Sequence, residues 1–165
     1  MMTELIQQLI ENLRDELKAY GELLALFEEQ QEHVMSRHAD RVLDSVTRIN
    51  AQALALNRAR VLRETTQRTL AVTVGQDSDA GIFVLAQFLP EDYRPLLQAL
   101  VRENNQLLTR VQQRARQNHL LLSRSVELMQ RFIQSLMPCQ NTTVYAGDGV
   151  VHPNCSAHTL YEAVG

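Results

Sequence analysis

Residues 5–27 read LIQQLIENLRDELKAYGELLALF, and their apolar positions indicate helices that pack side by side. The apolar residues recur at alternating steps of four and three, which is the spacing of a heptad seam along one side of an α-helix. The seam consists of Ile6, Ile10, Leu13, Leu17, Tyr20, Leu24 and Phe27. Further leucines widen the apolar face on one side, as expected for a helix that packs against two neighbours. The stretch therefore predicts a helix over about residues 3–34 in a helical bundle.

A second helical segment follows a short break at Ser36, which is expected to be its N-cap, and runs to about Thr69. Its predicted core stripe continues the four-three spacing and consists of Val42, Val46, Ile49, Ala53 and Leu56. Arg60 and Arg63 occupy the next seam positions. Either the packing face shifts there or the helix extends beyond its partner, and the sequence leaves both readings open.

The third helical segment is the longest and lies between Pro95, a residue suited to the first turn of a helix, and Pro138. Asn104 and Asn118 interrupt its seam, and buried asparagines at such positions fix the register of packing. Its C-terminal half carries more apolar side chains than one neighbouring helix would cover. Those that lie beyond the main stripe are Leu120, Leu121, Leu128 and Ile133.

Glycine, proline and short polar residues mark residues 72–95 as the main connection between long helices. Within it, the apolar stretch 82–89 predicts a short helix that caps one end of the bundle. The predicted fold is all-α: an elongated antiparallel bundle of three long helices and one short helix with coiled-coil-like packing. The predicted domains are a helical bundle over residues 1–138 and a flexible tail over residues 139–165, ordered only on a partner.

Composition supports helices and excludes several classes of protein. The 165 residues include 25 Leu and 16 Gln but no Trp, which disfavours an all-β fold. No apolar run is long enough to span a bilayer, so stable membrane insertion is not expected. Acidic residues at the start of the chain occupy positions where a secretory signal would carry bases. We therefore expect a cytoplasmic protein with reduced cysteines.

Charge is distributed unevenly along the chain. Residues 1–34 carry a net charge of −6, whereas residues 37–68 and 94–131 carry +4 and +5. The arginines are interleaved with leucine and glutamine and lack aromatic residues on which bases could stack, so nucleic-acid binding is not expected. The charges predict instead that the two basic helices lie beside the acidic one.

No arrangement of residues predicts catalysis or a bound cofactor. The sequence contains no nucleophile elbow, no glycine-rich phosphate loop and no His-Glu-x-x-His motif. The residues with metal-ligand chemistry are Cys139, His152, Cys155 and His158. Their spacing lacks a Cys-x-x-Cys pair, so we expect no metal site and leave the role of these four residues open.

The order of three motifs resembles the FlgN-like family of flagellar export chaperones of the bacterial type III system. Residues 13–24 contain the pattern Leu-x-x-Glu-Leu-x-x-Tyr-x-x-Leu around Glu16, Leu17 and Tyr20. The long last helix carries an Asn-x-x-Leu-Leu segment that begins at Asn118, and a Tyr-x-x-x-Gly segment begins at Tyr145. The resemblance covers nearly the whole chain.

The resemblance implies a chaperone that binds hook-filament junction proteins, prevents their aggregation and delivers them to the flagellar export gate. The surplus apolar surface of the last helix suits a partner helix. The partner-binding residues that we predict are Leu121, Leu128, Phe132, Ile133 and, in the tail, Tyr145. The four apolar residues are open to two other readings, bundle core and homodimer face. A coiled-coil adaptor protein without an export role is the alternative function.

Overall fold

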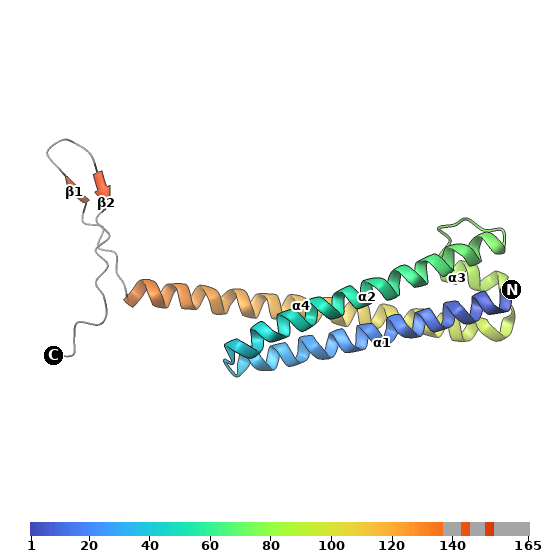
Figure 1. Ribbon diagram of the computed structural model, residues 1–165, viewed down its shortest axis with the longest axis horizontal. Helices are drawn as coiled ribbons and strands as arrows, with labels where there is room; N and C mark the ends of the chain where they lie inside the picture. Colours follow the sequence, from blue (N-terminus) through green and yellow to red (C-terminus); the bar gives the residue numbers. More distant parts are fainter. Residues whose placement is uncertain (137–142, 146–150, 154–165) are drawn as a thin grey trace. The chain divides into compact units, whose positions relative to one another are not determined.

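The computed structural model describes residues 1–136, 143–145 and 151–153 and contains three long helices (Figure 1). A short α-helix and two turns of 3-10 helix connect the second long helix to the third. In chain order the elements are α1 (Met2–Met35), α2 (Ala39–Thr73), α3 (Ile82–Leu85), η1 (Ala86–Phe88), η2 (Glu91–Tyr93) and α4 (Arg94–Leu136). The predicted all-α fold of three long helices and one short helix is confirmed.

The chain divides into two compact units, Met1–Leu122 and Ser123–Gly165. The second unit contains the last part of α4 and a hairpin of two short antiparallel strands, β1 (Thr143–Tyr145) and β2 (Val151–Pro153). Tyr145 is paired with Val151 in this hairpin. The sequence pattern does not predict these strands. The domain boundary that we expect after residue 138 stays a prediction.

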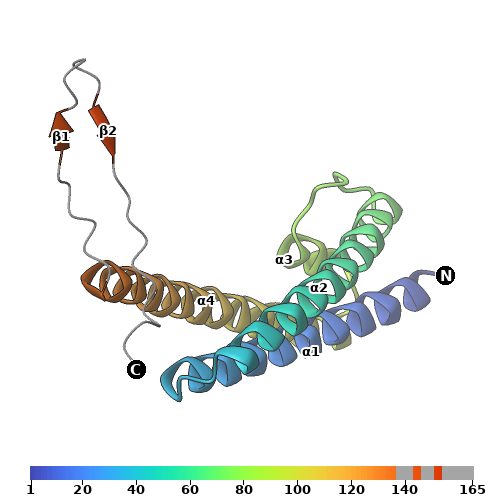
Figure 2. The ribbon, with the colours of Figure 1, turned by 60° about the vertical axis from the view of Figure 1, so that its left-hand side comes forward.

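The helices of the first unit alternate in direction, and the side-chain contacts show the register. Asn104 donates to the carbonyl of Leu13, and Asn118 donates to the carbonyl of Phe27, so α1 and α4 run in the same direction. The contact between Arg63 and Glu16 places a late residue of α2 beside an early part of α1. The helix α2 therefore runs antiparallel to both, as Figures 1 and 2 show.

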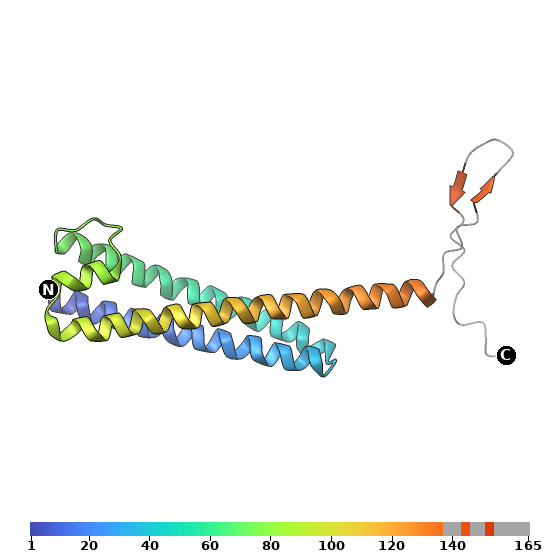
Figure 3. The same cartoon turned by 180° about the vertical axis from the view of Figure 1, so that it is seen from behind.

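Two apolar clusters form the core of the first unit. The first joins the beginning of α1 to the end of α2, to α3 and to the beginning of α4, and its buried members are Ile6, Leu9, Ile10, Leu13, Leu70, Ile82, Leu89, Leu97 and Leu100. The second joins the later part of α1 to α2 and α4 through Tyr20, Leu23, Leu24, Ile49 and Val111. Ile82 and Leu89 lie in the first cluster, so the short helix covers this end of the bundle, as predicted (Figure 3).

The break between α1 and α2 differs from the prediction. Ser36 is the C-cap of α1 and not the N-cap of α2, which is His38. Arg37 has a φ of 58°, and the amides of Arg37 and His38 donate to the carbonyls of Val34 and His33. This is a Schellman ending. Because it uses Arg37 and His38 to close α1, the next helix begins only at Ala39.

The buried face of α2 also differs from the prediction. Val46 and Ala53 are exposed, whereas Ser45 is buried and Gln52 is half-buried. Ser45 and Gln52 lie one residue before the predicted positions, whereas Ile49 is buried and Leu56 is half-buried as predicted, so the inner face is turned by about 40° from the predicted stripe. Arg63 also lies on this inner face, where it contacts Glu16 of α1. The helix α2 therefore does not extend beyond its partner α1 at Arg63, which was one of the two possibilities that the sequence left open.

Candidate functional site

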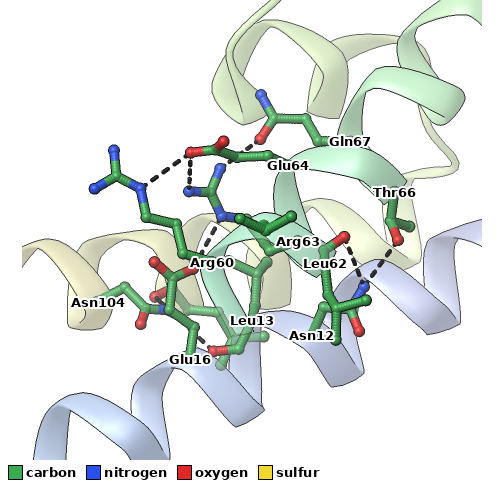
Figure 4. Close-up of polar contacts among 12 residues, drawn as sticks. Asn12, Leu13, Glu16, Arg60, Leu62, Arg63, Glu64, Thr66, Gln67 and Asn104 are labelled. Atoms are coloured by element: carbon green, nitrogen blue, oxygen red, sulfur yellow. Dashed lines mark hydrogen bonds and ion pairs between the residues drawn. The ribbon is translucent and has the colours of Figure 1, made fainter. Parts of the chain in front are cut away.

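A buried ion pair separates the two apolar clusters of the first unit (Figure 4). Nε of Arg63 lies 2.9 Å from Oε2 of Glu16, and the two side chains are 17% and 5% exposed. Arg63 has a second acceptor, because its Nη1 donates to Oε1 of Gln67 at 2.8 Å. Burial, followed by the charge of Glu16, raises the pKa of the neighbouring Tyr20. This polar layer fixes the register of α1 against α2.

A second polar layer joins all three long helices. Nδ2 of Asn118 donates to Oε1 of Gln30 at 3.1 Å, and Nε2 of Gln30 donates to Oγ of Ser45 at 3.1 Å. Asn118 and Asn104 are both buried, as predicted for register-fixing asparagines. Their Oδ1 atoms have no hydrogen-bond partner among the described residues. Such buried acceptors weaken packing, so α4 is held in register at some cost in stability.

Ion pairs between the helices follow the charge pattern of the sequence. Arg48 of α2 lies 2.8 Å from Glu29 of α1, and Arg114 of α4 lies 3.5 Å from Glu28. The hydrogen bond from Arg48 lowers the pKa of Glu29. The prediction that the basic helices lie beside the acidic one is confirmed.

The last part of α4 exposes an apolar face in the second unit. Leu128 is 65% exposed, and Phe132 and Ile133 are also more than half exposed. Val126, Met129 and Leu136 add to the exposed apolar surface of this part of the helix. Exposed apolar surface on a folded protein is a candidate interaction surface. We call the exposed set Val126, Leu128, Met129, Phe132, Ile133 and Leu136 the α4 face.

The α4 face continues the spacing of the buried seam in the earlier part of α4. Phe132 lies at heptad intervals from Val111 and Asn118, which are buried against α1. The heptad pattern of α4 is therefore longer than the part of this helix that is buried in the first unit.

The other predicted partner-binding residues have different surroundings. Leu121 belongs to the first unit and is half-buried. The backbone of Tyr145 lies in β1. The structure brings Leu128, Phe132 and Ile133 together on one helix.

Of the residues considered for a metal site, His152 lies in β2. Cys139, Cys155 and His158 lie outside the described residues. The part of the chain that the structure describes contains no group of three His, Cys, Asp or Glu residues with metal-binding geometry. No helix of that part is long and apolar enough to cross a membrane.

Comparison with known proteins identifies the family. A family model described as FlgN protein matches residues 1–153. The chain belongs to the FlgN family. No curated protein and no solved structure matches it.

The FlgN family is a family of flagellar export chaperones and not of enzymes. Membership confirms the resemblance inferred from Glu16, Leu17, Tyr20, Asn118 and Tyr145. It supports a general role for this FlgN chain as a chaperone of flagellar proteins in flagellar assembly.

Proposed function

We propose that this protein binds hook-filament junction proteins in the cytoplasm, prevents the aggregation of their terminal helices and delivers them to the flagellar export gate. Family membership supports the general chaperone role. The observation that carries the finer proposal is the α4 face, since it offers exposed apolar side chains at helical spacing.

The α4 face suits an amphipathic helix as its partner. Leu128 and Phe132 are four residues apart, and Met129 and Ile133 repeat this spacing beside them. A partner helix with apolar residues at steps of three and four would pack its side chains between these two rows. Such a helix aggregates when it is unpaired, so covering it is what a chaperone for helical termini has to do. Leu121, which belongs to the first unit, is proposed as a further contact of the client.

Charges beside the α4 face supply orientation more than affinity. Arg131 is bound to Glu127 within the same helix at 2.6 Å, and both side chains are largely exposed. Exposed pairs of this kind contribute little to stability. Arg124 also lies on this part of the helix and is exposed. A client helix with acidic residues along one edge would therefore be steered toward the two arginines.

The test compares the full chain with a variant that carries both Leu128→Glu and Phe132→Glu. Because both side chains are exposed, the variant is expected to keep its helix content while its capture of a purified junction protein is lost. The matched control is Gln134→Glu, which adds a charge to an exposed position on the side of the same helix away from the α4 face. Undiminished capture by the double variant would refute the α4 face as the client surface. Unfolding of the free variant would show that these residues are core.

Tyr145 carries a separate part of the proposal, contact with the client or the export gate. The substitution Tyr145→Ala in the full chain is expected to weaken binding to a junction protein or to the cytoplasmic part of the gate. Both affinities are measured by titration calorimetry against the unchanged chain. Equal affinities for both partners would remove Tyr145 from the binding surface.

A further inference from the structure

The helix α4 is attached unevenly to the rest of the first unit. Its beginning is held by Leu97 and Leu100, which are both buried in the first cluster. Arg94 adds two hydrogen bonds to backbone carbonyls of the segment that precedes the helix. From residue 101 to residue 122, Val111 is the only buried apolar residue of the helix. We call residues 101–122 the arm of α4.

The other buried residues of the arm are two asparagines, and each is only partly satisfied. Nδ2 of Asn104 donates to the carbonyl of Leu13 at 3.1 Å, and Nδ2 of Asn118 donates to the carbonyl of Phe27 at 2.7 Å. Their Oδ1 atoms are closed off from solvent, and among the described residues they are the only buried side-chain nitrogen or oxygen atoms without a hydrogen-bond partner. A buried acceptor without a donor costs free energy, and exposure to water recovers it.

The polar contacts of α2 with α1 differ from those of the arm. The buried ion pair between Arg63 and Glu16 is 2.9 Å long, and it leaves no buried side-chain atom without a partner. In the arm, Arg114 lies 3.5 Å from Glu28, and both side chains are partly exposed. An ion pair in contact with water contributes little to stability. The arm is therefore held less firmly than α2.

A hollow of about 190 Å³ lies beside the beginning of the arm. The helix α4 lines it with Val101, Asn104 and Leu108, and α1 lines it with Glu16 and Tyr20 among others; Figure 4 shows Asn104 and Glu16. Protein interiors contain few gaps of this size, and side chains beside a gap lack part of their dispersion contacts. Incomplete packing and an unpaired acceptor thus occur at the same level of α4.

We propose that the arm of α4 opens from α1 and closes again in the folded protein, with Leu97 and Leu100 as its pivot. Opening brings both Oδ1 atoms into water and exposes only one fully buried apolar side chain of the arm, that of Val111. It also uncovers Tyr20 and Leu24 of the second cluster.

The arm is therefore a conformational device with a hidden apolar surface. The surface consists of side chains of α1 at helical spacing, which the closed arm covers. A partner that binds this surface shifts the equilibrium toward the open form. The inference concerns the first unit alone and is independent of the α4 face.

The first test follows the hydrogen exchange of the full chain in low concentrations of urea. A helix that is released from its neighbours is marginally stable in water, so the amides of the arm are expected to exchange through an opening that depends weakly on urea. Amides of α1 over residues 6–24 and those around Leu100 are expected to be protected at least about tenfold more strongly. Uniform protection along α4, or an arm as protected as α1, would overturn the proposal.

The second test compares two buried positions of α4 by thiol labelling. Each chain carries Cys139→Ser and Cys155→Ser, so the introduced cysteine is its only thiol. Val111→Cys in the arm is expected to react at least about tenfold faster than Leu97→Cys at the pivot, because local opening reaches only the first. Circular dichroism checks that both variants are folded. Equal rates, or faster labelling at position 97, would contradict the pivot.

The third test removes one unpaired acceptor. Asn104→Leu is expected to slow the labelling of Val111→Cys about tenfold, since no buried acceptor then favours the open form and the hollow has room for the new side chain. The two carbonyls that Asn104 binds also accept hydrogen bonds within their own helices, so they keep a donor.

The matched control is Asn57→Leu, the same change at an exposed position of α2, which is expected to leave the labelling rate unchanged. Unchanged or faster labelling in the Asn104→Leu chain would overturn the proposal. Equal slowing by both substitutions would do the same, because the effect would then not come from the buried acceptor.

Discussion

The ion pair between Glu16 and Arg63 gives the sharpest test of the packing described above. The two partners are unequal: the carboxylate of Glu16 is 5% exposed, whereas the guanidinium of Arg63 is 17% exposed. Arg63 keeps further acceptors in Gln67, at 2.8 Å, and in Glu64, at 3.5 Å. Removal of Arg63 should therefore lower the free energy of unfolding more than removal of Glu16.

The expected costs follow from what each substitution leaves buried. Arg63→Met leaves the Glu16 carboxylate buried without its cation, which costs about 3 kcal/mol at the low end of the range for broken buried pairs. Glu16→Gln leaves an arginine that is still hydrogen-bonded and partly solvated, so the cost is about 1 kcal/mol. In a chain with Arg63→Met and Glu16→Leu, no unpaired charge remains. Its stability should be closer to that of the unchanged protein than Arg63→Met alone.

The assay is urea unfolding near neutral pH, followed by the circular dichroism of the helices, with the free energy of unfolding taken from each curve. Arg60→Met is the control, because Arg60 pairs with Glu64 on the exposed side of α2 and should cost less than about 1 kcal/mol. The reasoning fails if Glu16→Gln costs as much as Arg63→Met. It also fails if the double substitution costs the sum of the two single ones.

Three further predictions concern stability. Leu13→Ala should lower the free energy of unfolding by about 2–5 kcal/mol, because Leu13 is buried in the first cluster. Leu62→Ala, at an exposed position of α2, should change it by less than about 0.5 kcal/mol. Urea unfolding measures both values. Arg37→Gly should raise the melting temperature, since glycine relieves the left-handed φ of 58° and the gain of about 1–2 kcal/mol exceeds the added chain entropy. Burial and then the charge of Glu16 raise the pKa of Tyr20, so the folded state favours the neutral tyrosine. The contribution of Tyr20 to the stability of the fold is therefore complete below the ordinary tyrosine pKa of about 10 and is lost as pH rises through the folded-state pKa. Tyr20→Phe should therefore shrink the alkaline loss of helix seen by circular dichroism, and an unchanged profile would contradict this.

Local periodicity was sufficient to predict the helices. The seam of α1 from Ile6 to Leu24 is buried as predicted, except that Leu17 is half-buried, because a strong heptad pattern has only one apolar face to bury. Proline at position 95 and the apolar stretch 82–89 predicted the start of α4 and the short helix. The order of the motifs was sufficient to predict the family, because it can be read from the sequence without knowing how the helices pack.

The buried face of α2 was predicted only in part. Ile49 is buried and Leu56 is half-buried as predicted, but Ser45 and Gln52 occupy the inner positions that were expected for Val46 and Ala53. Tertiary contacts decide: Ser45 is buried because Gln30 reaches it, and Arg63 is on the inner face because Glu16 binds it. Such polar contacts join residues far apart in the chain, and no local pattern records them.

The amino-acid sequence was enough to predict where the chain is helical, which face of α1 is buried, and the family to which the protein belongs, because helix formation and helix amphipathicity depend on residues three and four apart. The polar positions of the inner face of α2 and the exposed part of α4 came only from the three-dimensional packing. Packing depends on the polar groups that other helices present, such as Gln30 beside Ser45, and these groups are far away in the sequence.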